Sequence, residues 1–361
     1  MITSIYSIKD ATLYEKYPSL NTGLDALLEV SKVKDQTSSY NSRALIKFDL
    51  AELTNNYTLN VLTQTASYYL RLTAANPTEI PVDYTLYSYP VSQSWNMGVS
   101  KFTIKDSGSN GVSWNYKLTS LNTGSVWATG SYATTTTGSW ATNPGGGNWY
   151  TSSAHSQSYS YQTANVLMDV TSTVRSWLLG TIPNEGFILK KSDADEQSTT
   201  ELGSIRFFSK ESNTIYSPQL EMRYDDSIYH TSYSIVDYKD EVVVNITNLQ
   251  ESYKETGKAR LNITSRPKYP VRTHATSSNY LDLYQLPSSS YYSIRDAHTD
   301  ITFVPFDEIN TKISADAEGS YFILNLNGLP VQRYYKVLIM SKVRSNEQYL
   351  YDSNWIFKVV S

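Results

Sequence analysis

The chain has 361 residues, enough for two domains of ordinary size, and its hydrophobic content of 40% can supply two cores. The net charge of −4 comes without a basic run, which excludes the electrostatic driver of non-specific nucleic-acid binding and a polybasic membrane patch. Cysteine is absent, which excludes disulfides, thiol nucleophiles and cysteine-ligated zinc. We therefore expect no nucleic-acid partner, no membrane partner, no metal and no cofactor.

Strand signals begin at the first residues and recur at short intervals. Each segment alternates apolar and polar residues, and Asn, Gly, Pro and Ser clusters separate one from the next. The predicted strands of the first half are residues 2–10, 27–33, 43–50, 67–72 and 84–90. This spacing predicts a β-sandwich or a jelly roll.

Residues 106–163 differ in composition, because they are poor in Ile, Leu and Val and rich in Gly, Ser and Thr. Such a segment cannot supply regular buried strands throughout, so we expect long inserted loops from about residue 95 to residue 163. Aromatic residues in these loops are the candidates for contact with a partner. The set is Trp95, Trp114, Trp127, Trp140, Trp149, Tyr159 and Tyr161.

Three uses for these aromatic residues stay open on the sequence alone. Rigid aromatic side chains on loops can anchor a protein interface, can pack down on the sheet and hold the loops, or can stack on a glycan. Tyrosine is also frequent in the whole chain, with 31 Tyr against 9 Phe and 7 Trp. Tyrosine suits both strands and contact surfaces, so the composition does not decide between the three uses.

One short helix is predicted after the loops. Val170, Val174, Trp177 and Leu178 form an apolar stripe at helical spacing, which Asp169 can cap at the N-terminal end. Gly180 stands where a helix-terminating glycine belongs. Further strands are predicted at residues 186–190, 205–209 and 218–224.

A domain boundary is expected at the Asp-Asp-Ser run of residues 225–227, which gives domains of residues 1–226 and 227–361. The second domain has its own strand series and no transition to helical periodicity. Its predicted strands are residues 241–246, 259–264, 321–326, 334–339 and 355–360. A smaller, immunoglobulin-like β-sandwich is the simplest interpretation.

Residues for catalysis are not evident in the sequence. The four histidines, His155, His230, His274 and His298, are far apart along the chain, and we expect them to be solvated. The acidic run of residues 193–196 (Asp-Ala-Asp-Glu) is expected to be a solvated loop, and no motif for a metal, a phosphate or a nucleophile is present. We therefore expect a protein that is not an enzyme, with no catalytic residue.

The order of landmarks along the first domain resembles that of the DNRLRE module, a jelly-roll domain related to carbohydrate-binding modules. The landmarks are Asp-Ala-Thr-Leu at 10–13, Arg-Ala-Leu-Ile-Lys-Phe-Asp-Leu at 43–50, and Pro-Gln-Leu-Glu-Met at 218–222. The Trp-, Gly- and Thr-rich insertion departs from the compact form of that module. The resemblance implies a jelly-roll sandwich for residues 1–226.

The insertion resembles segments of virion structural proteins of tailed phages, especially T4-like phages of cyanobacteria. The segments are residues 89–98 and 145–151, with further similarity at 251–255, 266–270 and 304–306. This resemblance implies a structural protein of the particle, in the capsid, the neck or collar, or the tail. Its partners would be other virion proteins and symmetry copies of itself, and it would be made in the host cytoplasm.

Two other functions stay open. A glycan-binding adhesin on a host-facing fibre predicts an exposed row of Trp side chains and glycan as a partner. An enzyme acting on cell-wall polysaccharide predicts a buried carboxylate required for turnover.

Overall fold

The computed structural model describes residues 1–36, 38–51, 53, 65–75, 83–104, 111–120, 123–127, 145–160, 165–230, 234–236, 241–269, 284–344 and 347–361. The chain divides into two compact units. The N-terminal unit is Ile5–Glu221, and the C-terminal unit is Met1–Ser4 together with Met222–Ser361. The boundary expected at residue 226 lies a few residues after this division. That residues 1–4 belong to the C-terminal unit was not expected.

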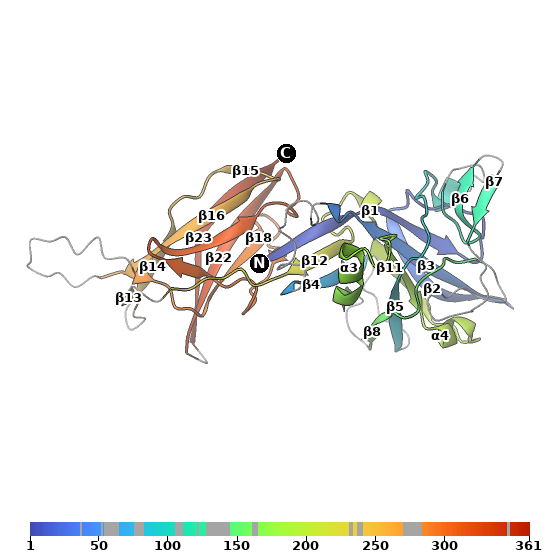
Figure 1. Cartoon of the computed structure of the whole chain (residues 1–361), viewed down its shortest axis with the longest axis horizontal. Helices are drawn as coiled ribbons and strands as arrows, with labels where there is room; N and C mark the ends of the chain where they lie inside the picture. The colour runs from blue at the N-terminus through green and yellow to red at the C-terminus, as the bar shows by residue number, and fades with distance from the viewer. Residues whose placement is uncertain are drawn as a thin grey trace, which may run out of the picture. The chain divides into compact units, whose positions relative to one another are not determined.

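The chain is all-β in its described part, as predicted, and the N-terminal unit is built mainly from twelve strands and two short α-helices (Figure 1). The strands are β1 (Ile2–Tyr14), β2 (Leu27–Asp35), β3 (Ser38–Phe48), β4 (Ser67–Leu72), β5 (Tyr84–Pro90), β6 (Tyr116–Ser120), β7 (Thr123–Val126), β8 (His155–Tyr159), β9 (Val166–Asp169), β10 (Phe187–Lys191), β11 (Gly203–Phe208) and β12 (Gln219–Arg223). The helices are α3 (Thr171–Leu178) and α4 (Asp193–Gln197), with single 3₁₀ turns η1 (Phe102–Ile104) and η2 (Lys210–Ser212).

Ten of these strands form one hydrogen-bonded sheet in the order β8-β5-β10-β3-β1-β12-β4-β9, with β2 paired to β3 and β11 paired to β2. Backbone bonds also join the end of β4 to β11, since Ala75 donates to Arg206 (2.8 Å) and Phe208 donates to Thr73 (3.1 Å). The strands β3, β1, β12, β4, β11 and β2 therefore follow one another around a ring. Each strand of this ring therefore has a neighbour on both sides, and in the described part of the unit β8 and β9 end the branches that extend from it.

The strands form where the sequence alternates. In β4 the side chains of Tyr68, Leu70 and Leu72 are buried while those between them are half-buried, as the two-residue period of a strand requires. Strands β1 and β3 pair antiparallel, with Ala11 opposite Leu45 and Leu13 opposite Arg43. The predicted strands at 2–10, 27–33, 43–50, 67–72 and 84–90 are all observed, the first three with shifted ends and the last two with the predicted bounds.

Helix α3 confirms the predicted helix. Val174 and Trp177 are buried, and Gly180 follows the helix with φ of +70°. The N-cap residue is Val170, not Asp169 as expected. The Asp169 carboxylate nevertheless accepts a hydrogen bond from the Thr171 backbone N–H (2.9 Å), so it still satisfies a free donor of the first turn.

The insertion at 95–163 was expected to consist of long loops, but it also contains regular elements. Its described residues include η1, the antiparallel pair β6–β7 and the strand β8, which pairs with β5. Threonine and serine at alternating positions of these strands explain why apolar periodicity did not reveal them.

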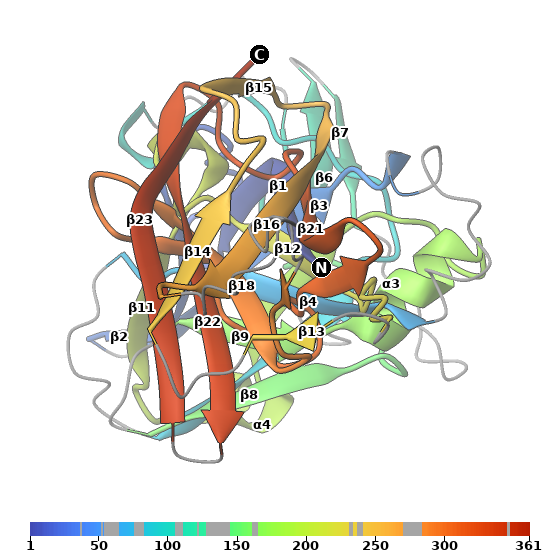
Figure 2. The same cartoon turned by 90° about the vertical axis from the view of Figure 1, so that its left-hand side faces the viewer.

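The C-terminal unit is a β-sandwich, as predicted. One sheet has β13 (Ser234–Ile235), β17 (Tyr284–Gln285), β16 (Lys258–Pro267), β21 (Gly319–Asn325) and β20 (Ser314–Asp316) in that order, with β14 (Val242–Ile246) paired to β16. The other has β15 (Ser252–Lys254), β23 (Glu347–Val360), β22 (Arg333–Arg344), β18 (Ser290–Asp296) and β19 (Thr302–Val304). The strands β22 and β23 form the longest antiparallel pair of this sheet, and Figure 2 shows them side by side.

The two sheets of this unit bury their facing side chains against each other. Tyr292 of β18 stacks on Phe322 of β21, with ring centroids 4.2 Å apart, and both are buried. Tyr335 and Phe357 from the second sheet lie in the same core cluster. Ile2 also belongs to this core, which explains why residues 1–4 are part of the unit.

Among the helices of the described residues, none has the length and apolar character needed to cross a membrane.

Candidate functional site

The structure places the predicted contact aromatics inside the N-terminal unit. Trp95, Trp114, Trp127 and Trp149 are at most 5% exposed, and they pack with Val91 and Val112 on Ala11, Leu13, Leu45 and Ile188 of the sheet. We call these four indoles the Trp layer. Tyr159 is equally buried, and Trp140 and Tyr161 lie outside the described residues. The burial corresponds to internal packing, so these five side chains are not an exposed contact row.

Two indole N–H groups of the Trp layer donate hydrogen bonds within the unit. The indole N–H of Trp95 donates to the carbonyl of Glu185 (2.9 Å), and that of Trp127 donates to the carbonyl of Ser113 (3.1 Å). Burial of an indole stabilises a fold best when its N–H finds such a partner. The Trp layer is thus built as a core between the sheet and the insertion.

A buried ion cluster lies beside the Trp layer. The guanidinium of Arg43 in β3 binds both carboxylate oxygens of Glu196, at 3.0 and 2.8 Å, and the Lys190 ammonium lies 3.1 Å from the same carboxylate. The side chains of all three are at most 1% exposed. The expectation of a solvated acidic loop at 193–196 is therefore wrong for Glu196, because α4 turns this carboxylate inward onto two cations.

Arg43 also connects the ion cluster to the Trp layer. Its guanidinium carbon lies 4.8 Å from the ring centroid of Trp114 and 5.1 Å from that of Trp149, within the range of cation–π attraction. Its third contact is a hydrogen bond to the carbonyl of Gly146 (2.6 Å). Gly146 has φ of +72°, and a Cβ there would meet the Arg43 guanidinium at 2.6 Å. Glycine at this position lets the loop approach the cation.

The histidines are dispersed, as expected, but not all are solvated. His155 is half-buried and its Nε2 lies 2.7 Å from the Thr173 hydroxyl of α3. Burial lowers the pKa of His155 below its ordinary value, although Asp169 opposes this. His230 and His298 are exposed, and His274 lies outside the described residues.

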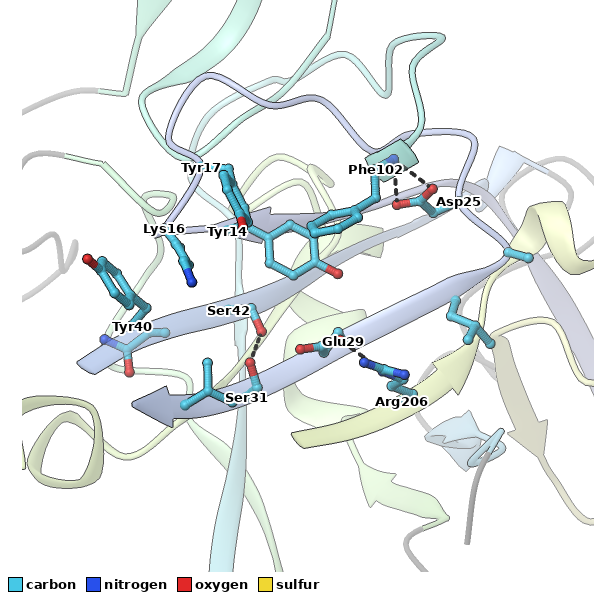
Figure 3. A pocket seen from close by; sticks show the side chains of 14 residues that line it. Tyr14, Lys16, Tyr17, Asp25, Glu29, Ser31, Tyr40, Ser42, Phe102 and Arg206 are labelled. Carbon is cyan, nitrogen blue, oxygen red and sulfur yellow. Dashed lines mark hydrogen bonds and ion pairs between the residues drawn. The ribbon is translucent and has the colours of Figure 1, made fainter. Parts of the chain in front are cut away.

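The best candidate for a functional site is an open cavity of about 450 Å³ in the N-terminal unit, which the sequence did not predict (Figure 3). This volume is in the range of roughly 300–1,000 Å³ that is typical of small-molecule sites. Its lining comes from the end of β1 and the residues after it, from β2, β3 and β11, and from η1. We call it the tyrosine cavity.

One wall of the tyrosine cavity is aromatic. The Phe102 ring of η1 contacts the Tyr14 ring at 5.1 Å and the Tyr17 ring at 5.5 Å between centroids, and all three side chains are half-buried. Tyr40 lines the cavity from β3, and the Lys16 ammonium lies 5.8 Å from its ring and 5.9 Å from that of Tyr17. Figure 3 shows the hydroxyl groups of Tyr14 and Tyr17 among the cavity-lining side chains.

The floor of the cavity is polar. Glu29 of β2 and Arg206 of β11 stand opposite each other in the paired strands and form an ion pair of 2.9 Å. Deeper in the floor, the hydroxyl groups of Ser31 and Ser42 are hydrogen-bonded at 2.5 Å. Asp25 is the other acidic residue of the lining, and both of its carboxylate oxygens accept a hydrogen bond from the Phe102 backbone N–H, at 3.0 and 3.3 Å.

Two ionisable groups of the cavity are shifted towards their neutral forms. Burial raises the pKa of the Tyr14 phenol, and the neighbouring carboxylates of Glu29 and Asp25 raise it further. Burial also raises the pKa of Asp25, against the opposing effect of the Phe102 N–H. At neutral pH Tyr14 is therefore a neutral hydroxyl that can donate or accept a hydrogen bond.

The tyrosine cavity combines apolar rings with hydroxyl, carboxylate and guanidinium groups, which suits a small ligand with one apolar face and a polar edge. Within the described residues, no group of three or more His, Asp and Glu side chains could hold a metal ion. The weak signals in the sequence were the spacing of Tyr14 and Tyr17 and the opposite charges of Glu29 and Arg206. Neither signal identifies a cavity before the strand pairing is known.

Comparison with known proteins adds no identification. No family model matches the chain, and no curated protein matches it.

Proposed function

We propose that the chain is a non-enzymatic structural protein of a tailed-phage particle, in the head, the neck or collar, or the tail. It would dock to neighbouring virion proteins and to copies of itself. The sequence resemblance is the starting point, and the arrangement of the resembling segments supports it.

The observation that carries the proposal is that the two insertion segments similar to phage virion proteins pair with each other. Val91 and Trp149 form an isolated β-bridge, and Ser92 and Asn148 are joined by a backbone hydrogen bond (3.0 Å) and a side-chain hydrogen bond (2.6 Å). Tyr150 then donates to the carbonyl of Pro90 (2.9 Å). Segments 89–98 and 145–151 thus form one structural element, so the resemblance of both segments concerns a single region of the fold.

The landmarks of the DNRLRE resemblance are also neighbours. Residues 10–13 of β1 pair in register with residues 43–46 of β3, and β12, which holds residues 219–223, lies on the other side of β1. Three segments that are distant in sequence therefore form the centre of one sheet. This supports a common jelly-roll-like scaffold.

A docking surface is available on the outer face of the β22–β23 pair. Tyr334, Leu350 and Ile356 are 45%, 59% and 41% exposed, and the strand register puts them on the same face as Lys336 and Lys358. Exposed aromatic and aliphatic residues gathered on one face of a sheet are typical of an interface that is covered in an assembly.

Mass spectrometry of purified particles tests the proposal. The chain should be found in particles after gradient purification, in a stoichiometry that matches the symmetry of the head, neck or tail. Its absence from purified particles would contradict the proposal.

A glycan-binding adhesin is the second candidate function, and the tyrosine cavity is the observation that favours it. A sugar ring offers an apolar C–H face to aromatic side chains and a rim of hydroxyl groups to polar ones. The Tyr14–Phe102–Tyr17 wall and the Glu29–Arg206 pair provide both. Binding of the purified chain to a glycan array would favour this function.

A further inference from the structure

The charges in the tyrosine cavity say more about a ligand than its shape does. The lining contains two cations, Lys16 and Arg206, and two carboxylates, Asp25 and Glu29, so its formal charge is zero. A cavity that recognises an acidic sugar needs a cation whose charge is still available to the ligand carboxylate.

Each of these charges already has a partner on the chain. Arg206 is paired with Glu29 at 2.9 Å, and Lys16 is paired with Asp35 at 2.5 Å, outside the cavity lining. Asp25 accepts the Phe102 backbone N–H. An anionic ligand would have to compete with these contacts and would lie close to two carboxylates, which disfavours it.

We infer that the tyrosine cavity binds an uncharged saccharide and discriminates against uronic, sialylated and sulfated sugars. This inference rests on the glycan-binding candidate function and specifies its ligand class. The sugar stacks its C–H face on the Tyr17 ring and contacts the Phe102 ring, which is inclined at 81° to that of Tyr17. Its hydroxyl groups exchange hydrogen bonds with the Tyr14 phenol, the Glu29 carboxylate and the Arg206 guanidinium.

Glu29 is the specificity-determining residue in this arrangement. Its carboxylate neutralises Arg206 and accepts hydrogen bonds from sugar hydroxyl groups. Removal of its charge would leave Arg206 without its paired carboxylate and would give the lining a formal charge of +1. The same cavity would then accept an acidic sugar better than before.

The test uses the full chain on a glycan array that carries neutral glucans, galactans and mannans together with uronate, sialylated and sulfated glycans. Titration calorimetry then measures the dissociation constants of the neutral oligosaccharide that binds best and of hexagalacturonate. We expect neutral glycans to bind and hexagalacturonate to bind at least tenfold more weakly. Y17A should weaken binding of the neutral ligand at least tenfold, and Y269A, at an exposed tyrosine of the C-terminal unit, should leave its affinity within twofold.

Two further variants separate binding from folding. E29Q should strengthen hexagalacturonate binding several-fold while it weakens the neutral ligand. R206A, at a side chain that is 54% exposed, should weaken binding of the neutral ligand several-fold. Circular dichroism should show that this variant is still folded.

The outcomes distinguish the inference from the function on which it rests. Preference of the unmodified chain for acidic glycans would overturn the inference and leave the glycan-binding candidate standing. Binding that neither Y17A nor R206A weakens would overturn the assignment to this cavity. A chain that binds no glycan would overturn both, and the virion proposal would still be decided by particle composition.

Discussion

The carboxylate of Glu196 contacts both buried cations of the ion cluster, Arg43 and Lys190. E196Q keeps the size of the side chain and removes its charge. Two buried cations then face a neutral amide, and an amide cannot accept the guanidinium through two equivalent oxygens. We expect the N-terminal unit to lose much of its stability.

The size of the stability loss in E196Q follows from the burial of the ion cluster. Removal of one partner of a buried ion pair costs about 3–5 kcal/mol, because the remaining charge stays in a poorly solvated place. Arg43 also holds Trp114, Trp149 and the Gly146 carbonyl, so its displacement would disturb the Trp layer. For a unit of this size, 1 kcal/mol shifts the melting temperature by about 2–4 °C, which predicts a decrease of roughly 6–20 °C.

The control is D193N on the same helix. Asp193 also contacts Lys190, but its side chain is 67% exposed, and an exposed ion pair contributes only about 0–1 kcal/mol. Tryptophan fluorescence during urea unfolding reports mainly on the N-terminal unit, which contains six of the seven Trp residues. Equal urea midpoints for E196Q and D193N would refute the argument that the buried cluster stabilises the unit.

Three further predictions concern the N-terminal unit. Burial raises the pKa of Asp10 to about 7, so the stabilisation by its protonated form is present below pH 4 and is lost as pH rises to 7, by at most about 4 kcal/mol. D10N should remove this pH dependence of the urea midpoint. The same dependence of the midpoint on pH in D10N would contradict the prediction. A Cβ at Gly186 (φ +86°) would meet the Ile46 carbonyl at 2.2 Å, while one at Gly180 (φ +70°) would meet nothing within 4 Å. G186A should therefore cost about 2–4 kcal/mol and G180A about 1 kcal/mol, and equal unfolding midpoints would be evidence against the close approach. W127A removes a side chain that is 1% exposed and should cost about 3–5 kcal/mol of unfolding free energy, whereas a contact residue would leave stability unchanged.

Several strands that the sequence predicted have one buried and one exposed face, whereas β10 was predicted from a run of apolar residues and is buried throughout. In β16, Ala259, Leu261 and Ile263 are buried and alternate with exposed or half-buried neighbours, and the segment was predicted from that pattern. Strand β18 was missed because six of its seven residues are buried and three of these are Ser290, Ser293 and Asp296, so the segment shows neither alternation nor an apolar run. The hydroxyl groups of its serines are buried and hydrogen-bonded, as in the bond of 2.8 Å between those of Ser290 and Ser341.

The tyrosine cavity could not be predicted from local pattern. Glu29 and Arg206 are separated by 177 residues, and only the pairing of β2 with β11 brings them together. The position of Phe102 beside Tyr14 likewise depends on a turn within the insertion. A cavity of this kind is a property of strand register, and register is decided by the whole sheet.

The roles of the aromatic loop residues also depend on distant partners. A tryptophan among glycines and serines looks exposed in the sequence because no aliphatic neighbour is near it. In the structure the neighbours are Leu13, Leu45 and Ile188, which lie in three separate strands. The acidic run at 193–196 was misjudged for the same reason, since Arg43 and Lys190 lie outside it.

The assignment of residues 1–4 to the C-terminal unit affects how the chain can be made and cut. The Thr3 hydroxyl donates to the carbonyl of Asn327 (2.8 Å) across 324 residues, and Ile2 fills part of the same core. On the ribosome residues 1–4 emerge before the sandwich that receives them, so that sandwich can be completed only after residues 222–361 have also been synthesised. A fragment that starts at residue 222 would lack a piece of its own interior, and a synthetic peptide of residues 1–4 supplied in trans is the natural complement.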